Sequence, residues 1–277
     1  THTSKKQVLM KILDIKNITK SFKDPNNINI KVVDNISFSI NSGEVLGIVG
    51  ESGSGKTTLG RMIIRLINPD SGKIVFNNLD ITKLPKRDMK KVRKNMQIIF
   101  QDPFGSLNPR HSIEGILSEP LIIHKYGNSE KIKTRILELL DQVGLPKKSL
   151  KLYPHEFSGG QRQRIAIARS IALKPKFLIA DEAVSALDVS IQSQILNLIS
   201  DLIKEYGISM IFISHDLSVV RHISSKIAVM QKGKIVEIGN TEKVLNNPSK
   251  KYTKMLISSV PGLNINFKWT VKPSKKI

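Results

Sequence analysis

The chain has 277 residues, of which 40% are hydrophobic and 24% charged, an ordinary globular composition that excludes wholesale disorder and a fibrous repeat. It contains no cysteine, which excludes disulfides, thiolate-bound zinc, cysteine-ligated iron–sulfur clusters and a cysteine nucleophile. Lysine and arginine number 44 against 23 acidic residues, and the formal net charge of +21 favours anionic partners such as nucleotides, nucleic acid or an acidic membrane surface.

Two kinds of strand are expected in the first 50 residues. Residues 10–40 alternate short apolar and polar runs around the turn at Asp24–Asn27, which predicts antiparallel strands. Residues 44–49 form a short apolar strand that ends in glycine. Helical spacing follows over residues 56–67, and Pro69 with the Asp70-Ser71-Gly72 turn is expected to stop that helix.

The rest of the chain alternates strands and helices. Short apolar strands are expected at 97–100, 177–180 and 210–213, and helices over much of 102–151, at 161–173 and at 251–258. Buried strands that are each followed by a helix indicate a parallel sheet covered on both faces. No stretch approaches the roughly 18 apolar residues of a membrane-spanning helix, so we expect a soluble chain, or one held at a membrane by another component.

A dense basic run lies between Lys83 and Lys94, where seven cations accompany one acid, Asp88. Such a run is either a solvated surface or a patch that meets anionic lipid headgroups, where each cation adds up to about 1 kcal/mol. The sequence leaves both interpretations open.

The segment Gly50-Glu51-Ser52-Gly53-Ser54-Gly55-Lys56-Thr57 fits the phosphate-binding pattern G-x-x-x-x-G-K-[ST], with a strand before it and a helix after it. The glycines let the backbone fold tightly around an anion, and the N–H groups and helix N-terminus direct positive partial charge at phosphate. Lys56 adds a full charge for the β- and γ-phosphates, and Thr57 offers a hydroxyl to Mg²⁺.

Two adjacent carboxylates follow the strand at 177–180. Asp181 and Glu182 come at its carboxyl end, where ligands bind in α/β sheets. Asp181 is expected to hold Mg²⁺, and Glu182 to take a proton from an attacking water. An isolated pair of this kind is also explained as charges at a helix N-terminus, and the matched phosphate loop decides against that explanation.

Ser158-Gly159-Gly160-Gln161 allows two interpretations. Ser158 and Gln161 have the spacing of a capping box. Gly159 and Gly160, however, each weaken a helix by up to about 1 kcal/mol relative to alanine, and a cap alone requires neither. Bare backbone at a helix N-terminus suits a second phosphate contact.

Together these motifs resemble those of the ATP-binding-cassette (ABC) ATPases. Gly50–Thr57 is similar to their Walker A loop, Phe177–Asp181 to Walker B, Phe157–Gln161 to the signature motif and Ser185–Asp188 to the D-loop. Gln101 matches the Q-loop, His215 the switch histidine and Phe22 the aromatic residue that stacks on adenine. The resemblance spans residues 10–262 and implies an α/β P-loop NTPase fold with a RecA-like parallel-sheet core, an antiparallel β subdomain and a helical subdomain at about 102–175, followed by a basic tail at 263–277.

The finer resemblance is to the ATPases of oligopeptide, dipeptide and nickel importers, carried by Gln101–Arg110 and by the segment from Tyr252 to Pro261. Three departures from the family pattern are Phe157, Ala183 and Phe22, which stand where leucine, proline and tyrosine are usual. None removes a charge or a phosphate-facing group, so activity is expected to survive.

The resemblance also implies the cofactors, the site residues and the partners. ATP and Mg²⁺ are the expected cofactors; the nucleotide is bound by Phe22, Gly50, Ser52, Gly53, Ser54, Gly55, Lys56, Thr57, Thr58 and, from a second subunit, Ser158, Gly159, Gly160, Gln161 and Asp188. Glu182, His215 and Gln101 are the expected catalytic residues, and Thr57, Gln101 and Asp181 the expected metal ligands. The implied partners are a homologous or identical ATPase subunit, two transmembrane permease subunits and an extracellular substrate-binding protein, with the ATPase peripheral to the cytoplasmic face of the membrane.

Other functions within the same family stay open at this point. A nucleic-acid-associated ATPase agrees with the basic charge, but such proteins carry tandem cassettes or zinc-binding cysteines, and aromatic residues make up only 5% of this chain. An exporter ATPase is the other alternative. The cargo, peptide or nickel or a metal–chelator complex, is read by other chains and cannot be derived from this one.

Overall fold

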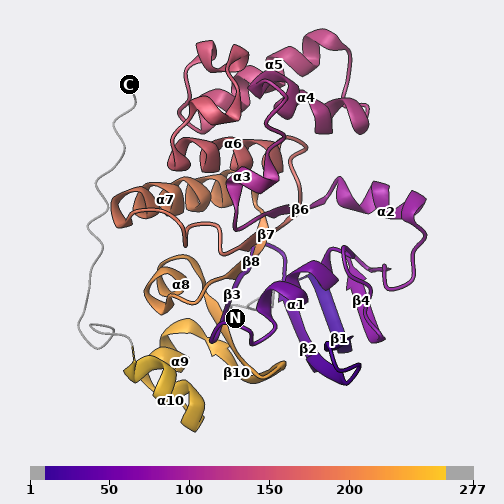
Figure 1. The fold of residues 1–277 in the computed structure, drawn as a ribbon, viewed down its shortest axis with the longest axis vertical. Helices are drawn as coiled ribbons and strands as arrows, with labels where there is room; N and C mark the ends of the chain where they lie inside the picture. The colour runs from indigo at the N-terminus through magenta and orange to yellow at the C-terminus, as the bar shows by residue number, and fades with distance from the viewer. Residues whose placement is uncertain (1–9, 260–277) are drawn as a thin grey trace, which may run out of the picture.

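The computed structural model describes residues 10–259, so the predicted basic tail at 263–277 lies outside the described residues. The fold contains two sheets and a layer of helices (Figure 1). The strands are β1 Lys11–Lys23, β2 Asn29–Asn41, β3 Val45–Val49, β4 Ser71–Phe76, β5 Leu79–Asp80, β6 Met96–Ile99, β7 Phe177–Asp181, β8 Ser209–Ile213, β9 Lys226–Gln231 and β10 Lys234–Asn240. The helices are α1 Lys56–Ile63, α2 Lys86–Arg93, α3 Pro103–Ser106, α4 Ile113–Ile123, α5 Ser129–Gln142, α6 Gly159–Ile171, α7 Val189–Tyr206, α8 Leu217–Ile223, α9 Thr241–Asn246 and α10 Lys251–Ser258, with 3₁₀ turns at Lys147–Lys151 and Pro154–Glu156.

The central sheet has the strand order β10-β9-β3-β8-β7-β6. All neighbours in it run parallel except β10, which pairs antiparallel with β9. Every residue of β3, β7 and β8 is buried. The predicted parallel sheet with both faces covered is therefore confirmed, and the carboxyl ends of β3, β7 and β8 meet at one edge.

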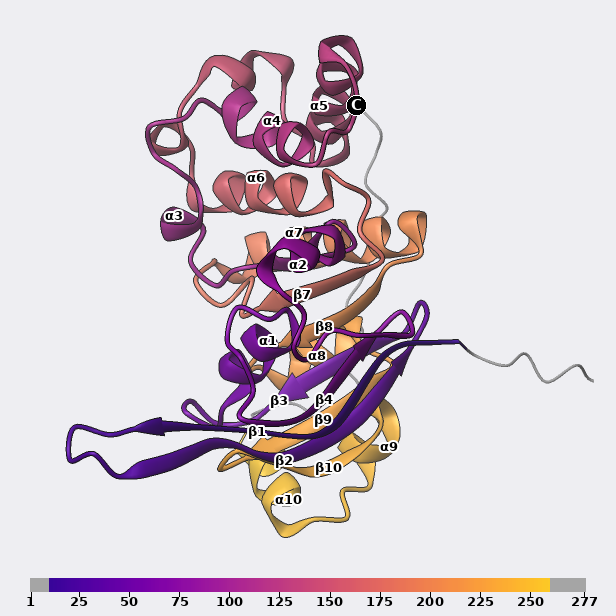
Figure 2. The same cartoon turned by 90° about the vertical axis from the view of Figure 1, so that its right-hand side faces the viewer.

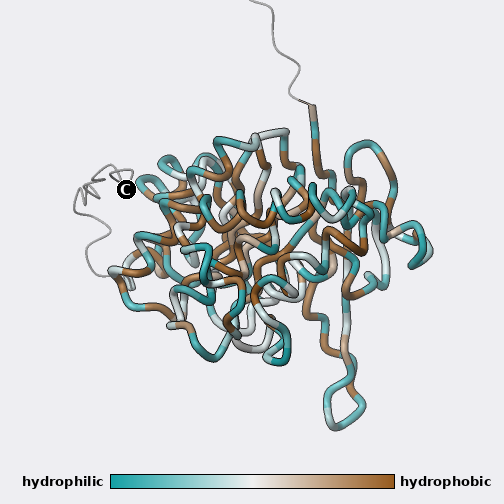
Figure 3. Tube along the Cα trace, turned by 90° about the horizontal axis from the view of Figure 1, so that it is seen from above, coloured by the Kyte–Doolittle hydropathy of each residue, from teal (hydrophilic) through white to brown (hydrophobic). Residues whose placement is uncertain are grey.

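Two hydrophobic cores lie on opposite faces of this sheet. Alternate residues of a strand enter different cores: Leu46 and Ile48 of β3 pack toward the antiparallel sheet and α1, whereas Val45 and Val49 pack toward the helical side. This division explains why the central strands read as continuous apolar runs. Seen from above, apolar segments run through the middle of the molecule and hydrophilic loops lie at its rim (Figure 3).

The second sheet is antiparallel and has the order β2-β1-β4-β5. The predicted pairing within residues 10–40 is confirmed, with Leu13 opposite Ile40 in β2. The expected end of the first helix is wrong in detail, because α1 ends at Ile63 and β4 begins at Ser71. Two of the three predicted turn residues, Ser71 and Gly72, belong to β4, where Ser71 pairs with Thr19. The local sequence does not indicate this pairing with a distant strand.

Helices α3 to α6 follow one another between β6 and β7 in the chain. Figure 2 shows α4, α5 and α6 as a layer above the parallel sheet, with the antiparallel sheet below it. The domain boundaries predicted from the resemblance stay a prediction. Within residues 10–259 no helix combines the length and the apolar character needed to cross a bilayer.

The basic run at 83–94 forms α2 and its flanks. Met89 and Val92 of α2 are buried, while Lys86, Arg87 and Lys90 are exposed. Both interpretations of this surface therefore stay open.

A buried arginine helps to hold the helical layer together, and its substitution tests that role. Arg135 of α5 is 2% exposed and donates hydrogen bonds to the carbonyls of Ile171 and Ala172 at the end of α6, at 3.0 and 3.1 Å. Arg135→Met leaves both carbonyls without that donor, and we expect a loss of about 2–4 kcal/mol in the free energy of unfolding, measured by urea denaturation. The control Arg87→Met, at an exposed position of α2, should stay within about 0.5 kcal/mol of the parent. Equal effects of the two substitutions would contradict this role of Arg135.

Candidate functional site

The loop between β3 and α1 is packed against backbone at two places. An ideal Cβ on Gly50 would lie 2.1 Å from the carbonyl oxygen of Met230, and one on Gly55, whose φ is +101°, would lie 2.3 Å from that of Val32. Real Cβ atoms do not approach oxygen so closely, so both positions require glycine. The loop is therefore fixed in shape by the two sheets on either side of it.

Lys56, the first residue of α1, folds back over this loop. Its side chain is buried, and Nζ donates hydrogen bonds to the carbonyls of Gly50 and Glu51, each at 2.8 Å. Burial lowers the pKa of Lys56, and the carboxylates of Glu182 and Asp181 partly oppose that shift. The result is a desolvated cation in the curve of a glycine-rich loop, a suitable partner for a polyanion.

The carboxyl end of β7 delivers Asp181 to the same place. Its Oδ1 accepts a hydrogen bond from the Thr57 hydroxyl at 2.9 Å. Burial raises the pKa of Asp181, and the bond from Thr57 opposes the shift. A carboxylate and a hydroxyl are oxygen donors of the kind Mg²⁺ prefers, and Mg²⁺ takes its remaining ligands from water and phosphate, so these residues fit that ion.

Glu182 lies at the centre of the predicted catalytic group. Its Oε2 accepts a hydrogen bond from Gln101 Nε2 at 3.0 Å and lies 3.5 Å from His215 Nδ1. Three residues from the ends of β6, β7 and β8 are thus brought together.

A pocket of about 240 Å³ collects many of the predicted residues. Its lining consists of Val32, Ser52, Gly53, Gly55, Lys56, Thr57, Thr58, Gln101 and Glu182. Ser54 is buried in the same loop, and its hydroxyl has no hydrogen-bond partner within the described part of the chain. Val32 was not predicted, because the sequence marks it as an ordinary strand residue and gives no sign that β2 reaches the loop.

The other predicted residues lie elsewhere. Of the described residues that line this pocket, none comes from 158–161. Asp188 is an exposed residue at the start of α7, and Phe22 is 41% exposed in the β1–β2 hairpin, with Lys20 Nζ 5.4 Å from its ring centroid. One chain therefore gathers the loop and the carboxylates but leaves the tetrapeptide outside.

The tetrapeptide at 158–161 does form a capping box on α6. Ser158 N–H donates to Gln161 Oε1 at 3.0 Å, and Gln161 N–H donates to Ser158 Oγ at 3.4 Å. Gly160 also has a packing reason, because an ideal Cβ there would lie 2.6 Å from Cγ2 of Ile191. Packing therefore explains the glycine at 160. Neither the cap nor packing explains Gly159, whose ideal Cβ would meet only ordinary contacts.

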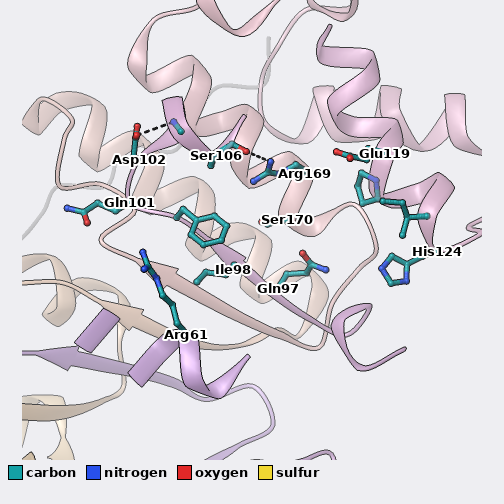
Figure 4. A pocket seen from close by; sticks show the side chains of 14 residues that line it. Arg61, Gln97, Ile98, Gln101, Asp102, Ser106, Glu119, His124, Arg169 and Ser170 are labelled. Carbon is teal, nitrogen blue, oxygen red and sulfur yellow. Dashed lines mark hydrogen bonds between the residues drawn. The ribbon is translucent and has the colours of Figure 1, made fainter. Parts of the chain in front are cut away.

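A second cavity of about 650 Å³ lies beside the first, between the core and the helical layer. Figure 4 shows Arg61 and Gln101 on its core side and Glu119, His124 and Arg169 on its helical side. Arg169 donates a hydrogen bond to the carbonyl of Ser106, which ties α6 to α3. Gln101 lines both cavities and is the link between them.

Two family models match the chain. The model described as "ABC transporter" matches residues 33–185, and the one described as "Oligopeptide/dipeptide transporter, C-terminal region" matches residues 236–276. The first contains most of the motifs above, and the second covers the segment that begins in β10.

Similar curated proteins and solved structures agree with these models. The chain is 50% identical over 252 residues to the oligopeptide transport ATP-binding protein OppF of Streptococcus mutans, covering 91% of this chain and 82% of that protein. It is 48% identical over 257 residues to AppF of Bacillus subtilis, covering 90% and 78%. The fold matches the dimeric post-hydrolysis state of the ATP-binding cassette MJ0796 bound to ADP and Pi with a TM-score of 0.75 and 30% identity, over 83% of this chain and 98% of that one. It matches cbiO1 from Clostridium perfringens with a TM-score of 0.76 and 28% identity, over 92% and 96%.

The buried carboxylate gives a prediction about pH. Burial raises the pKa of Asp181 in the folded chain, so ionisation of this carboxyl lowers the free energy of unfolding. That loss of stability sets in as pH rises through the pKa of the folded chain. Asp181→Asn keeps an oxygen to accept from Thr57 and removes the charge. We expect the variant to unfold at a higher temperature than the parent at pH 7, without nucleotide and with EDTA. The difference should shrink as pH falls below the folded pKa; lower stability of the variant at pH 7 would contradict the prediction.

Proposed function

We propose, from the premise that this chain belongs to the ABC transporter family and is an ATPase, that it powers a peptide importer by closing with a second ATPase subunit around ATP. The predicted family and fold class are confirmed by the matches above. The nucleic-acid and exporter alternatives are not favoured, since similar proteins are named for oligopeptide transport and peptide import. The observation that carries the proposal is the Glu182 carboxylate, held by Gln101 beside His215 at the edge of the pocket that contains Lys56.

The predicted residues in and around the pocket have proposed roles in this reaction. The loop from Gly50 to Gly55 and the ammonium of Lys56 hold the phosphates, with Thr58 beside them. Asp181, Thr57 and Gln101 hold Mg²⁺, which neutralises phosphate charge when bound. Glu182 takes the proton of the attacking water, and His215 orients that water against the γ-phosphate. The exposed ring of Phe22 stacks on the adenine.

The second half of the site comes from a partner subunit in this proposal. The residues at 158–161 begin α6 and lie outside the pocket of their own chain, although the N–H groups of Gly159 and Gly160 suit a phosphate. Gly159, which lacks a packing explanation, supports that assignment. Ser158–Gln161 and Asp188 then face the nucleotide held by the loop of the other subunit, so that ATP joins the two chains.

The cavity between the core and the helical layer is the proposed docking site of a transmembrane permease. It has about 650 Å³ of room, and Gln101 carries a change in the nucleotide pocket to it directly. Docking there places the ATPase at the cytoplasmic face of the membrane without a membrane span of its own. Two permease subunits and an external binding protein complete the importer.

Glu182→Gln tests the catalytic assignment. Because general-base catalysis contributes about 10²–10⁴-fold, ATP turnover of the assembled transporter should fall by at least about 100-fold while nucleotide affinity is kept. The variant should also accumulate as an ATP-bound dimer on size-exclusion chromatography. The matched control Glu130→Gln, at an exposed position of α5, should turn over ATP like the parent. Retained turnover in Glu182→Gln would remove this residue from its role.

Lys56→Ala separates binding from chemistry in the same assay. Removing the ammonium should weaken nucleotide binding itself, in contrast to Glu182→Gln. Unchanged affinity would contradict the assignment of the loop as the phosphate site.

Cargo requires the complete transporter. Co-expression of the chain with its permease and binding-protein subunits should give ATP-dependent uptake of labelled oligopeptides, and Lys56→Ala should abolish that uptake. Uptake of Ni²⁺ without peptide uptake would place the transporter in the nickel class instead.

A further inference from the structure

A tyrosine of the last described helix reaches the back of the phosphate loop. Tyr252 in α10 is 8% exposed, and its hydroxyl oxygen accepts a hydrogen bond from the backbone N–H of Glu51 at 3.3 Å. A small cavity of about 100 Å³ separates Tyr252 from the loop residues Ser52 to Ser54. Tyr252 is the first residue of the segment from Tyr252 to Pro261 that carries the finer resemblance. The proposed reaction cycle assigns no role to this segment.

The contact falls on a particular peptide unit. The N–H of Glu51 and the carbonyl of Gly50 belong to the same planar group, and in a trans peptide they point in opposite directions. The carbonyl of Gly50 accepts from Lys56 Nζ at 2.8 Å, whereas the N–H donates to Tyr252. This peptide is thus held from inside the pocket by the lysine and from outside by the tyrosine.

Tyr252 is itself held firmly. Its ring packs in the core on the helical side of the central sheet. The preceding turn is tied to β10, since the carboxylate of Glu237 accepts from Ser249 N–H and Oγ at 2.8 Å each and from Lys250 N–H at 3.1 Å. Burial raises the pKa of Tyr252, so the phenol stays neutral at physiological pH. The hydroxyl therefore presents a fixed acceptor to the loop.

We infer that Tyr252 is a positioning residue for nucleotide binding: its hydroxyl fixes the Gly50–Glu51 peptide and, through the Gly50 carbonyl, the ammonium of Lys56. A rotation of this peptide would break both hydrogen bonds together and turn the carbonyl that guides the lysine. The region from β10 to α10, which the oligopeptide/dipeptide transporter model matches, thereby contributes to the phosphate site from behind. This inference rests on the nucleotide-binding part of the proposed function.

Tyr252→Phe removes the hydroxyl and keeps the buried ring. A single neutral hydrogen bond has a net effect of about three- to tenfold on an equilibrium, so the full-length chain should bind MgADP about three- to tenfold more weakly by isothermal titration calorimetry. In the assembled transporter KM for ATP should rise by a similar factor with kcat at saturation unchanged. The control Tyr206→Phe removes a hydroxyl that accepts from Arg135 in the helical layer, and it should leave both values as in the parent.

Hydrogen exchange provides a readout that does not depend on nucleotide. Without nucleotide, the Glu51 amide should exchange at least about threefold faster in Tyr252→Phe than in the parent, whereas the amides of α5 should keep their rates. Unchanged affinity for MgADP, or unchanged Glu51 exchange, would overturn the inference. If the parent chain bound no MgADP, the proposed function would be wrong, and the exchange rate of Glu51 would still decide whether Tyr252 holds the loop.

Discussion

The close approach of the phosphate loop to two backbone carbonyls is the constraint on which the rest of the site depends. The carbonyl that crowds Gly50 belongs to Met230 in β9 of the central sheet, and the one that crowds Gly55 belongs to Val32 in β2 of the antiparallel sheet. The Gly233 N–H also donates to the carbonyl of Ser54 at 3.0 Å. The two sheets must therefore be correctly placed against each other before the loop can take its shape, and this couples the global fold to the local site.

Charge is the second constraint, because burying charged groups costs the folded chain stability. Burial favours the neutral forms of both Lys56 and Asp181, whereas the proposed function uses both as ions, to hold phosphate and Mg²⁺. Lys56 finds partial compensation in the carbonyls of its own loop, and Asp181 in the Thr57 hydroxyl. In the proposed function, nucleotide and metal would replace these partial contacts with full opposite charges. The same burial that costs the fold stability would thus raise the free energy available for binding.

The sequence predicts most of the pocket because its motifs are local. Consecutive residues determine the shape of the loop from Gly50 to Thr57 and of the strand that ends at Asp181. The alternation of buried strands and helices predicts a parallel sheet, in which the carboxyl ends of the strands meet at one edge. The sequence does not reveal contacts between distant segments. Nothing near Val32 indicates that β2 reaches the loop, and nothing near Gly160 indicates a close approach to Ile191.

The backbone conformation of Glu182, the proposed catalytic carboxylate, is not predicted by the local sequence either. Glu182 has a φ of +47°, in the left-handed region that a residue other than glycine adopts at a cost of about 1–3 kcal/mol. One tertiary hydrogen bond holds it there, since its N–H donates to Ile213 O at 3.0 Å. Two local bonds add to this, because its carbonyl accepts from the N–H and the hydroxyl of Ser185. This turn sends adjacent side chains to different partners, so that Asp181 bonds Thr57 while Glu182 meets Gln101.

Gln101 is placed to transmit a change from the nucleotide pocket to the larger cavity. Its amide donates to Glu182 and its side chain lines both the nucleotide pocket and the larger cavity under the helical layer. In the proposed function the amide oxygen of Gln101 would meet a bound metal or phosphate while its nitrogen donates to Glu182, and because the two atoms are fixed in one plane the ligand would orient the whole side chain. Binding in one cavity would then act on the wall of the other. Helix α3, which begins two residues later at Pro103, is tied to α6 through Arg169 and Ser106. A permease docked in the larger cavity and a second subunit facing the start of α6 would thus respond to the same displacement, which is the coupling that a nucleotide-driven importer requires.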